Sequence, residues 1–65
     1  MGSGFYSQLR ELLLAHGCQF KRQGKGSHEI WFSPANGRSF PVAVTVVSRI
    51  TANSILKQAG IDAKL

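Results

Sequence analysis

Residues 28–47 read HEIWFSPANGRSFPVAVTVV and carry two strand patterns separated by a turn. Residues 28–33 follow a strand pattern, with His28, Ile30 and Phe32 alternating with Glu29, Trp31 and Ser33. The PANG sequence at residues 34–37 has the composition of a tight turn. Residues 39–47 alternate again, with a phenylalanine and three valines on one side. We expect an antiparallel pair, in which Pro41 indicates a strand with a free edge.

A further strand and two helices flank this pair. Residues 18–22 predict a short strand, and residues 23–27, which read QGKGS, break it as a loop or hairpin turn. Residues 5–16 carry apolar side chains at helical spacing, and this spacing returns in a short second helix from about residue 51 to residue 59. Each helix is followed by a glycine of the kind that ends helices: Gly17 and Gly60.

These elements predict an α+β fold in the order α-β-β-β-α, the layout of double-stranded-RNA-binding domains. Two amphipathic helices cover one face of a three-stranded antiparallel sheet and leave the other face open to water or a partner. The expected core contains the valines, the leucine stripes of the helices and three strand residues: Phe20, Ile30 and Phe32. On the open face, Trp31 would stack on a base, cover aliphatic surface or meet a protein partner.

Length and charge limit the function further. With 65 residues, the chain has room for one domain, residues 1–65, with a flexible start at Met1–Gly4 and a tail at residues 62–65. Eight Lys and Arg against three Asp and Glu give a net charge of +5, and the isoelectric point is near 10.2. Polyanions are the natural partners of such a chain, although this charge also keeps a small domain soluble.

Cysteine content and hydropathy exclude several classes of protein. Cys18 is the only cysteine, which rules out an intrachain disulfide and the familiar cysteine-rich zinc sites. We expect it to be a buried structural thiol in a reducing, cytoplasmic protein. No apolar run approaches the roughly 20 residues of a membrane span, and the start lacks the pattern of a secretory signal. We therefore expect no membrane partner.

The residues best suited to chemistry lie together in the sequence KRQGKGSH, residues 21–28. The glycines let backbone amides approach a phosphate, Arg22 and Lys25 supply positive charge, and Ser27 adds a hydroxyl donor. A neutral His28 imidazole could take the proton of a ribose 2′-OH while Lys25 and the loop amides stabilise charge on the phosphate. The three acidic residues are too few and too scattered for a two-metal centre, so we expect neither a metal nor a cofactor.

Each of these features also has a plainer interpretation. Glycine and lysine are common in hairpins that face water and bind nothing. The alternation of His28 with Ile30 and Phe32 is also expected of a histidine at the rim of the core. His16 is better explained by the negative end of the first helix than by catalysis.

Three segments together resemble the HicA family of toxin–antitoxin ribonucleases: residues 20–28 (FKRQGKGSH), residues 36–38 (NGR) and residues 55–61 (ILKQAGI). The likeness extends roughly from residue 9 to residue 61. It implies a bacterial or archaeal mRNA interferase with a double-stranded-RNA-binding-like fold, which cleaves messages independently of the ribosome and so restrains growth. It also implies a cognate HicB antitoxin, and it makes His28 of the Gly26-Ser27-His28 motif the catalytic residue.

The resemblance leads to a metal-independent endoribonuclease with His28 as its acid/base residue. The expected RNA and phosphate contacts are Lys21, Arg22, Gly24, Lys25, Gly26, Ser27 and Arg38. Two departures from the family pattern lower the expected RNA affinity. Residues 45–49 read TVVSR where many relatives have a His-Pro-Gly-like, lysine-rich stretch, and Glu29 places a negative charge next to His28 where relatives often have a basic residue or a second histidine.

Two other hypotheses remain beside the enzyme. The first is a non-catalytic RNA-binding module of the same fold, in which His28 only positions a phosphate or a 2′-OH. The second is a protein-interaction domain whose open sheet face and Trp31 meet a partner. Loss of cleavage on replacement of His28 would distinguish the enzyme from the RNA-binding module. A salt-dependent affinity for RNA would distinguish both from the protein-interaction domain.

Overall fold

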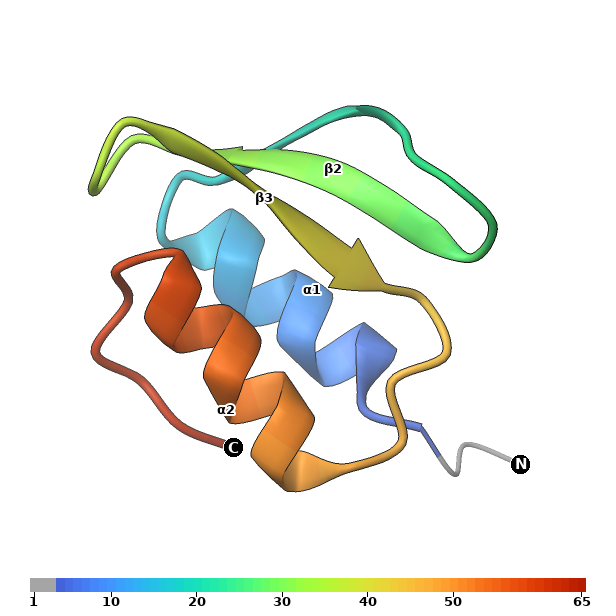
Figure 1. Cartoon of the computed structure of the whole chain (residues 1–65). Coiled ribbons are helices and arrows are strands. Elements are labelled where there is room, and N and C mark those ends of the chain that lie inside the picture. The colour runs from blue at the N-terminus through green and yellow to red at the C-terminus, as the bar shows by residue number, and fades with distance from the viewer. Residues whose placement is uncertain (1–3) are drawn as a thin grey trace.

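The computed structural model describes residues 4–65, so the flexible start expected at Met1–Gly4 lies outside the described residues except for Gly4. The elements follow in the predicted order: α1 (Tyr6–Ala15), β1 (Gln19–Gln23), β2 (His28–Ser33), β3 (Arg38–Ala43) and α2 (Arg49–Gln58). The strands form an antiparallel sheet in the order β1-β2-β3, and both helices lie on the same side of it (Figure 1). The predicted α+β fold is confirmed. Neither helix is long and apolar enough to cross a membrane.

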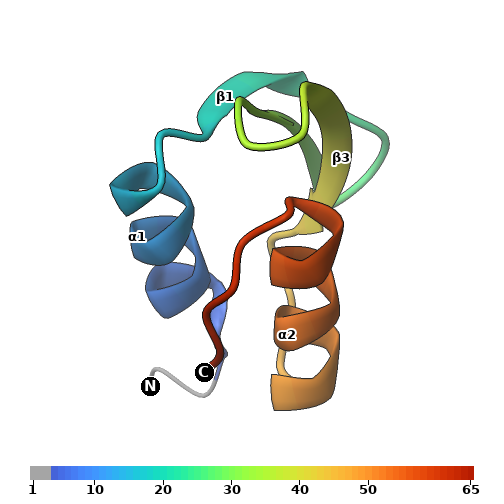
Figure 2. The same ribbon diagram turned by 90° about the vertical axis from the view of Figure 1, so that its left-hand side faces the viewer.

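The hydrophobic core lies between the sheet and the two helices, which stand side by side beneath it (Figure 2). Leu9 and Leu13 of α1 and Leu56 of α2 are fully buried, as the helical spacing predicted. Cys18 is also buried, which confirms it as part of the core. The predicted tail packs onto this core as well, and the Leu65 amide donates to the side chain of Asn53 over 2.7 Å.

The two faces of β2 are reversed relative to the prediction. Trp31 is only 1% exposed and packs in the core, so it is not available to stack on a base. Ile30 and Phe32 alternate with Trp31 and lie half-buried on the face away from the helices. Phe20 is 50% exposed and contacts the Trp31 ring edge to face, with 6.2 Å between the ring centroids. The expected core positions of Phe20, Ile30 and Phe32 were therefore wrong.

Polar groups on the buried face of β2 explain the reversal. Glu29 faces α1, where one of its oxygens accepts hydrogen bonds from the Tyr6 hydroxyl over 2.7 Å and from the Trp31 indole over 3.0 Å. The Ser33 hydroxyl is fully buried and donates to the Ala59 carbonyl at the end of α2. Because each polar group has a partner, this face is buried without leaving an unpaired donor or acceptor.

The third strand is shorter than predicted, and α2 begins earlier. The last register pair of β3 joins Ala43 to His28, and one further hydrogen bond follows it, from the Val44 amide to the Ser27 carbonyl over 2.9 Å. The chain then leaves the sheet, so Val46 still enters the core while Val44 and Val47 are exposed. The second helix starts at Arg49 instead of near residue 51.

Candidate nucleic-acid interface

The hairpin between β1 and β2 holds the backbone of His28 in place. The His28 amide donates to the Lys25 carbonyl over 3.0 Å. Its carbonyl accepts two hydrogen bonds of 2.9 Å, one from the Gly24 amide and one from the Gln23 side chain. The imidazole thus extends from a fixed position at the first residue of β2.

The two glycines of this hairpin meet different steric requirements. Gly26 has φ +58° and follows Lys25 in the turn that closes on the His28 amide, a position where the left-handed backbone favours glycine. At Gly24, a Cβ atom would lie 3.1 Å from the His28 carbonyl oxygen and 3.3 Å from the Ile30 side chain. A larger residue at either position would therefore disturb the backbone that carries His28.

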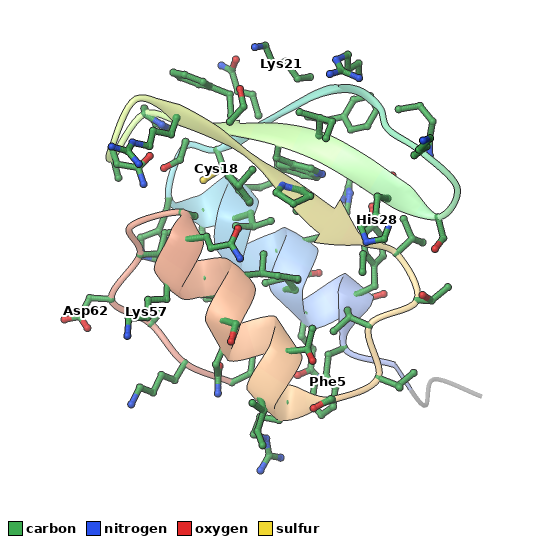
Figure 3. The ribbon with its side chains drawn as sticks, in the orientation of Figure 1. Phe5, Cys18, Lys21, His28, Lys57 and Asp62 are labelled. Atoms are coloured by element: carbon green, nitrogen blue, oxygen red, sulfur yellow. The ribbon has the colours of Figure 1, made fainter. Side chains whose placement is uncertain are left out.

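His28 shares the open face of the sheet with Ile30 and Phe32. Alternation along β2 places these three side chains opposite Glu29 and Trp31, which face α1 and the core. His28 is exposed and lies beside the end of β3 (Figure 3). This open face, defined by His28, Ile30 and Phe32 on its central strand, is the candidate interface.

An irregularity in β1 turns two consecutive basic residues toward the open face. Phe20 pairs with Trp31, but the next paired residue, Arg22, is opposite Ile30, so Lys21 is the extra residue of a β-bulge. Regular alternation would have sent Arg22 to the helix side with Phe20. Through the bulge, Arg22 instead lies level with Ile30 on the open face.

Lys21 reaches across the central strand. Its ammonium donates to the Ser39 hydroxyl over 3.2 Å, and Ser39 of β3 is the register partner of Phe32. The side chain therefore spans from β1 to β3 on the side away from the helices, where Figure 3 shows Lys21 above the sheet. Lys25 adds an exposed ammonium in the neighbouring hairpin.

The acidic residues lie elsewhere. Glu29 is next to His28 in sequence but faces α1, so the negative charge that we expected beside the site is on the opposite side of the sheet. Glu11 belongs to α1, and Asp62 follows α2. The open face thus combines an imidazole with basic side chains and has no carboxylate among residues 4–65.

Arg38 is not brought to this group. It pairs with Ser33 at the far end of β2, five residues from His28, or about 17 Å along an extended strand. Its role as an RNA contact stays a prediction. His16 ends α1, where its Nδ1 lies 2.9 Å from the Leu12 carbonyl oxygen, as expected of a residue at the negative end of a helix.

Sequence reasoning missed two residues of the site. Gln23 fixes the hairpin through the carbonyls of Gly26 and His28, at 3.3 and 2.9 Å, and no local pattern distinguishes it from a solvent-facing glutamine. Ser39 holds the Lys21 ammonium. The predicted alternation with Phe40 already placed Ser39 on the open face, but no pattern in the sequence linked it to Lys21.

Within the part of the chain that the structure describes, no three His, Cys, Asp or Glu side chains gather where they could hold a metal ion. Residues 45–49, where we expected a departure from the family pattern, follow β3 and end at the first residue of α2. There the Val46 carbonyl accepts from the Phe5 amide over 2.8 Å and ties the connection to the start of α1.

Comparison with protein-family models gives a match over residues 6–61 to the HicA toxin of bacterial toxin–antitoxin systems. The chain belongs to the HicA toxin family. The matched residues include all five elements and the whole hairpin that carries His28. Searches of curated proteins and of solved structures gave no match. As a HicA-family toxin, the protein is one half of a toxin–antitoxin pair.

Proposed function

We propose that this HicA-family toxin is a metal-independent endoribonuclease that cleaves mRNA in the cytoplasm. The supporting observation is the open face itself, where the exposed His28 imidazole shares one surface with Lys21 and Arg22 and no carboxylate of residues 4–65 competes for phosphate. Histidine is the side chain best suited to transfer protons near neutral pH.

His28 acts first as a general base. Its neutral imidazole takes the proton of a ribose 2′-OH, and the resulting oxygen attacks the adjacent phosphorus while the bond to the 5′-oxygen breaks. The protonated imidazole, or a water molecule, returns a proton to that leaving oxygen. The products are a 2′,3′-cyclic phosphate and a 5′-hydroxyl. Lys25, Arg22 and the hairpin around Gly26 and Ser27 stabilise charge on the phosphate.

A HicB-type antitoxin is the proposed partner. Covering the open face or the β1–β2 hairpin would separate His28 from RNA without altering the fold. The exposed, basic character of this surface supports either mode of inhibition.

Cleavage of a long single-stranded RNA in excess EDTA tests the proposal. Wild-type protein should cut the RNA, and His28→Ala should slow cutting by about 10²- to 10⁴-fold, the usual contribution of general acid–base catalysis. His16→Ala is the matched control, because it removes the other histidine from an exposed position at the end of α1. Equal activity of wild type and His28→Ala would refute the assignment. Intact RNA with binding retained would instead identify a non-catalytic RNA-binding module.

A further inference from the structure

We infer that the open face of the sheet is a track for single-stranded RNA, with Phe32 as the platform on which one base stacks. The inference rests on the proposed function, because it names the form of RNA that this ribonuclease takes and a second contact beyond the reacting phosphate. Four observations carry it: the row of side chains on β2, the basic residues beside that row, the neutral strand on its other side, and the arrangement of Lys21.

The row of side chains on β2 combines the proposed acid/base residue with an apolar surface. His28, Ile30 and Phe32 occupy every second position of the central strand and point to the same face. Four residues of an extended strand separate His28 from Phe32 by about 13 Å. A phosphate at His28 and a base at Phe32 therefore belong to different nucleotides of one strand. The row sets a direction for RNA along β2.

The charges of the strands on either side of this row suit the negatively charged backbone of a nucleic acid. On the β1 side, the bulge places Arg22 level with Ile30, and Lys21 reaches over β2. On the β3 side, the register partners of the row are small or neutral: Ser39, Pro41 and Ala43. Phosphates therefore have cations on one side of the track and no repulsion on the other.

Lys21 connects the basic side of the track on β1 to the Phe32 platform on β2. Its ammonium is held by Ser39, the register partner of Phe32, so its aliphatic stem crosses β2 on the open face and its ammonium lies level with Phe32. The Lys21 to Ser39 contact is exposed and therefore contributes little to stability. A base that stacks on Phe32 displaces this stem, and the released ammonium then binds the phosphate of the same nucleotide.

The apolar centre of the face favours a single strand over a duplex. A duplex presents phosphates and ribose hydroxyls to a protein surface and keeps its bases stacked inside, so it would leave Ile30 and Phe32 against polar groups. A single strand exposes the faces of its bases, which stack on aromatic side chains whatever their sequence. The combination of a half-buried phenylalanine and a basic flank therefore fits single-stranded RNA.

Fluorescence anisotropy of labelled RNA tests the inference in the His28→Ala background, in which the expected cleavage is slow enough to leave the RNA intact during the measurement. The probe is a mixed-sequence oligoribonucleotide, used alone or annealed to its complement at one fixed salt concentration. Phe32→Ala should weaken binding of the single strand by about 5- to 150-fold, equivalent to the 1–3 kcal/mol of one stacked base. Phe32→Tyr keeps an aromatic ring and should restore binding. Phe20→Leu is the matched control, because Phe20 is an exposed aromatic on the other face of the same sheet.

Circular dichroism and thermal melting verify that each variant is folded. If Phe32→Ala does not fold, Phe32→Leu keeps the apolar volume and should still weaken binding of the single strand. Equal affinity for single strand and duplex, or unchanged binding by Phe32→Leu, would overturn the inference. RNA binding by none of the proteins would also overturn it and would leave this face to a protein partner.

The inference and the proposed function fail separately. RNA cleavage that does not depend on Phe32 would remove the track and keep the enzyme. Binding that depends on Phe32, without cleavage by wild-type protein in EDTA, would keep the track and remove the enzyme.

Discussion

Replacing Glu29 with alanine should lower the free energy of unfolding by about 3 kcal/mol without removing any group from the open face. Glu29 lies next to His28 in sequence, but its carboxylate faces α1 and accepts hydrogen bonds from Tyr6 over 2.7 Å and from the buried Trp31 indole over 3.0 Å. Hydrogen bonds to a charged partner are worth about 1.5–3 kcal/mol each, and the half-buried position of Glu29 favours the lower value. Two such bonds at about 1.5 kcal/mol each give the estimate of about 3 kcal/mol.

The loss is large for a chain of this size. At about 0.05–0.15 kcal/mol per residue, 65 residues are stabilised by roughly 3–10 kcal/mol in total. Glu29→Gln keeps a neutral acceptor, and neutral hydrogen bonds are about half as strong, so its cost should be about 1.5 kcal/mol. Glu11→Ala, on the exposed surface of α1, should change stability by no more than about 0.5 kcal/mol.

Urea denaturation followed by circular dichroism gives these differences directly, and RNA cleavage by the same variants gives the second readout. The expected order of stability is wild type, then Glu29→Gln, then Glu29→Ala, with cleavage by folded Glu29→Gln close to that of wild type. A Glu29→Ala protein that is as stable as wild type, or a stable Glu29→Gln protein that no longer cleaves RNA, would refute the structural role of Glu29.

The ionisation of Tyr6 provides an independent measurement of the same contact. Burial raises the pKa of Tyr6 above its usual 10.0, and the hydrogen bond and negative charge of Glu29 raise it further, against the positive charge of Arg10. The protonated hydroxyl therefore contributes stability that is fully present below pH 10 and is lost as the pH rises through the folded-state pKa. Because Tyr6 is the only tyrosine, tyrosinate absorbance reports it alone, and Glu29→Gln should lower its pKa.

Other substitutions test the hairpin, the basic flank and the core. Gly26→Ala should lower the free energy of unfolding by about 1–2 kcal/mol because the φ of Gly26 is +58°, and it should also reduce RNA cleavage. Gly37→Ala is the matched control, because Gly37 has φ +67° in the other turn: it should lower the melting temperature similarly and leave cleavage unchanged. Arg22→Ala should reduce the slope of log affinity for single-stranded RNA against log salt by about 0.7, and Lys57→Ala on α2 should leave it unchanged. Ser33→Ala leaves two backbone groups without their partner, so thermal melts should show a loss of about 1–3 kcal/mol with normal cleavage below the transition.

The order of the elements could be predicted from sequence because each element has a local signal. The hydrophobic period changes from helical to alternating and back, and β2 occupies the predicted residues 28–33. The hairpin residues could also be identified as a group, because they are contiguous in the chain. Local patterns were sufficient wherever the structure is determined by neighbours in sequence.

The orientation of β2 could not be predicted in this way. Alternation defines two faces, and one carries Ile30 and Phe32 while the other carries Trp31, so apolar content alone does not identify the buried face. The choice depends on whether Glu29 and Ser33 find partners, and these come from α1 and from the end of α2. Contacts between residues distant in sequence decide the orientation.

The position of Arg22 depends on pairing as well. Regular alternation from Phe20 places it on the helix side, and only the bulge at Lys21 turns it to the open face beside Ile30. No feature of the sequence marks this bulge, because it exists only relative to β2. Sequence therefore identified the basic residues without determining which of them share a surface with His28.

The chemical ends of the RNA fragments test the central claim most directly. Wild-type protein should cleave an oligoribonucleotide in excess EDTA to fragments with a 2′,3′-cyclic phosphate and a 5′-hydroxyl, which mass spectrometry distinguishes from other ends, and His28→Ala should produce neither at a comparable rate. Fragments with 5′-phosphate ends, or the same cyclic ends produced equally fast by His28→Ala, would contradict the account.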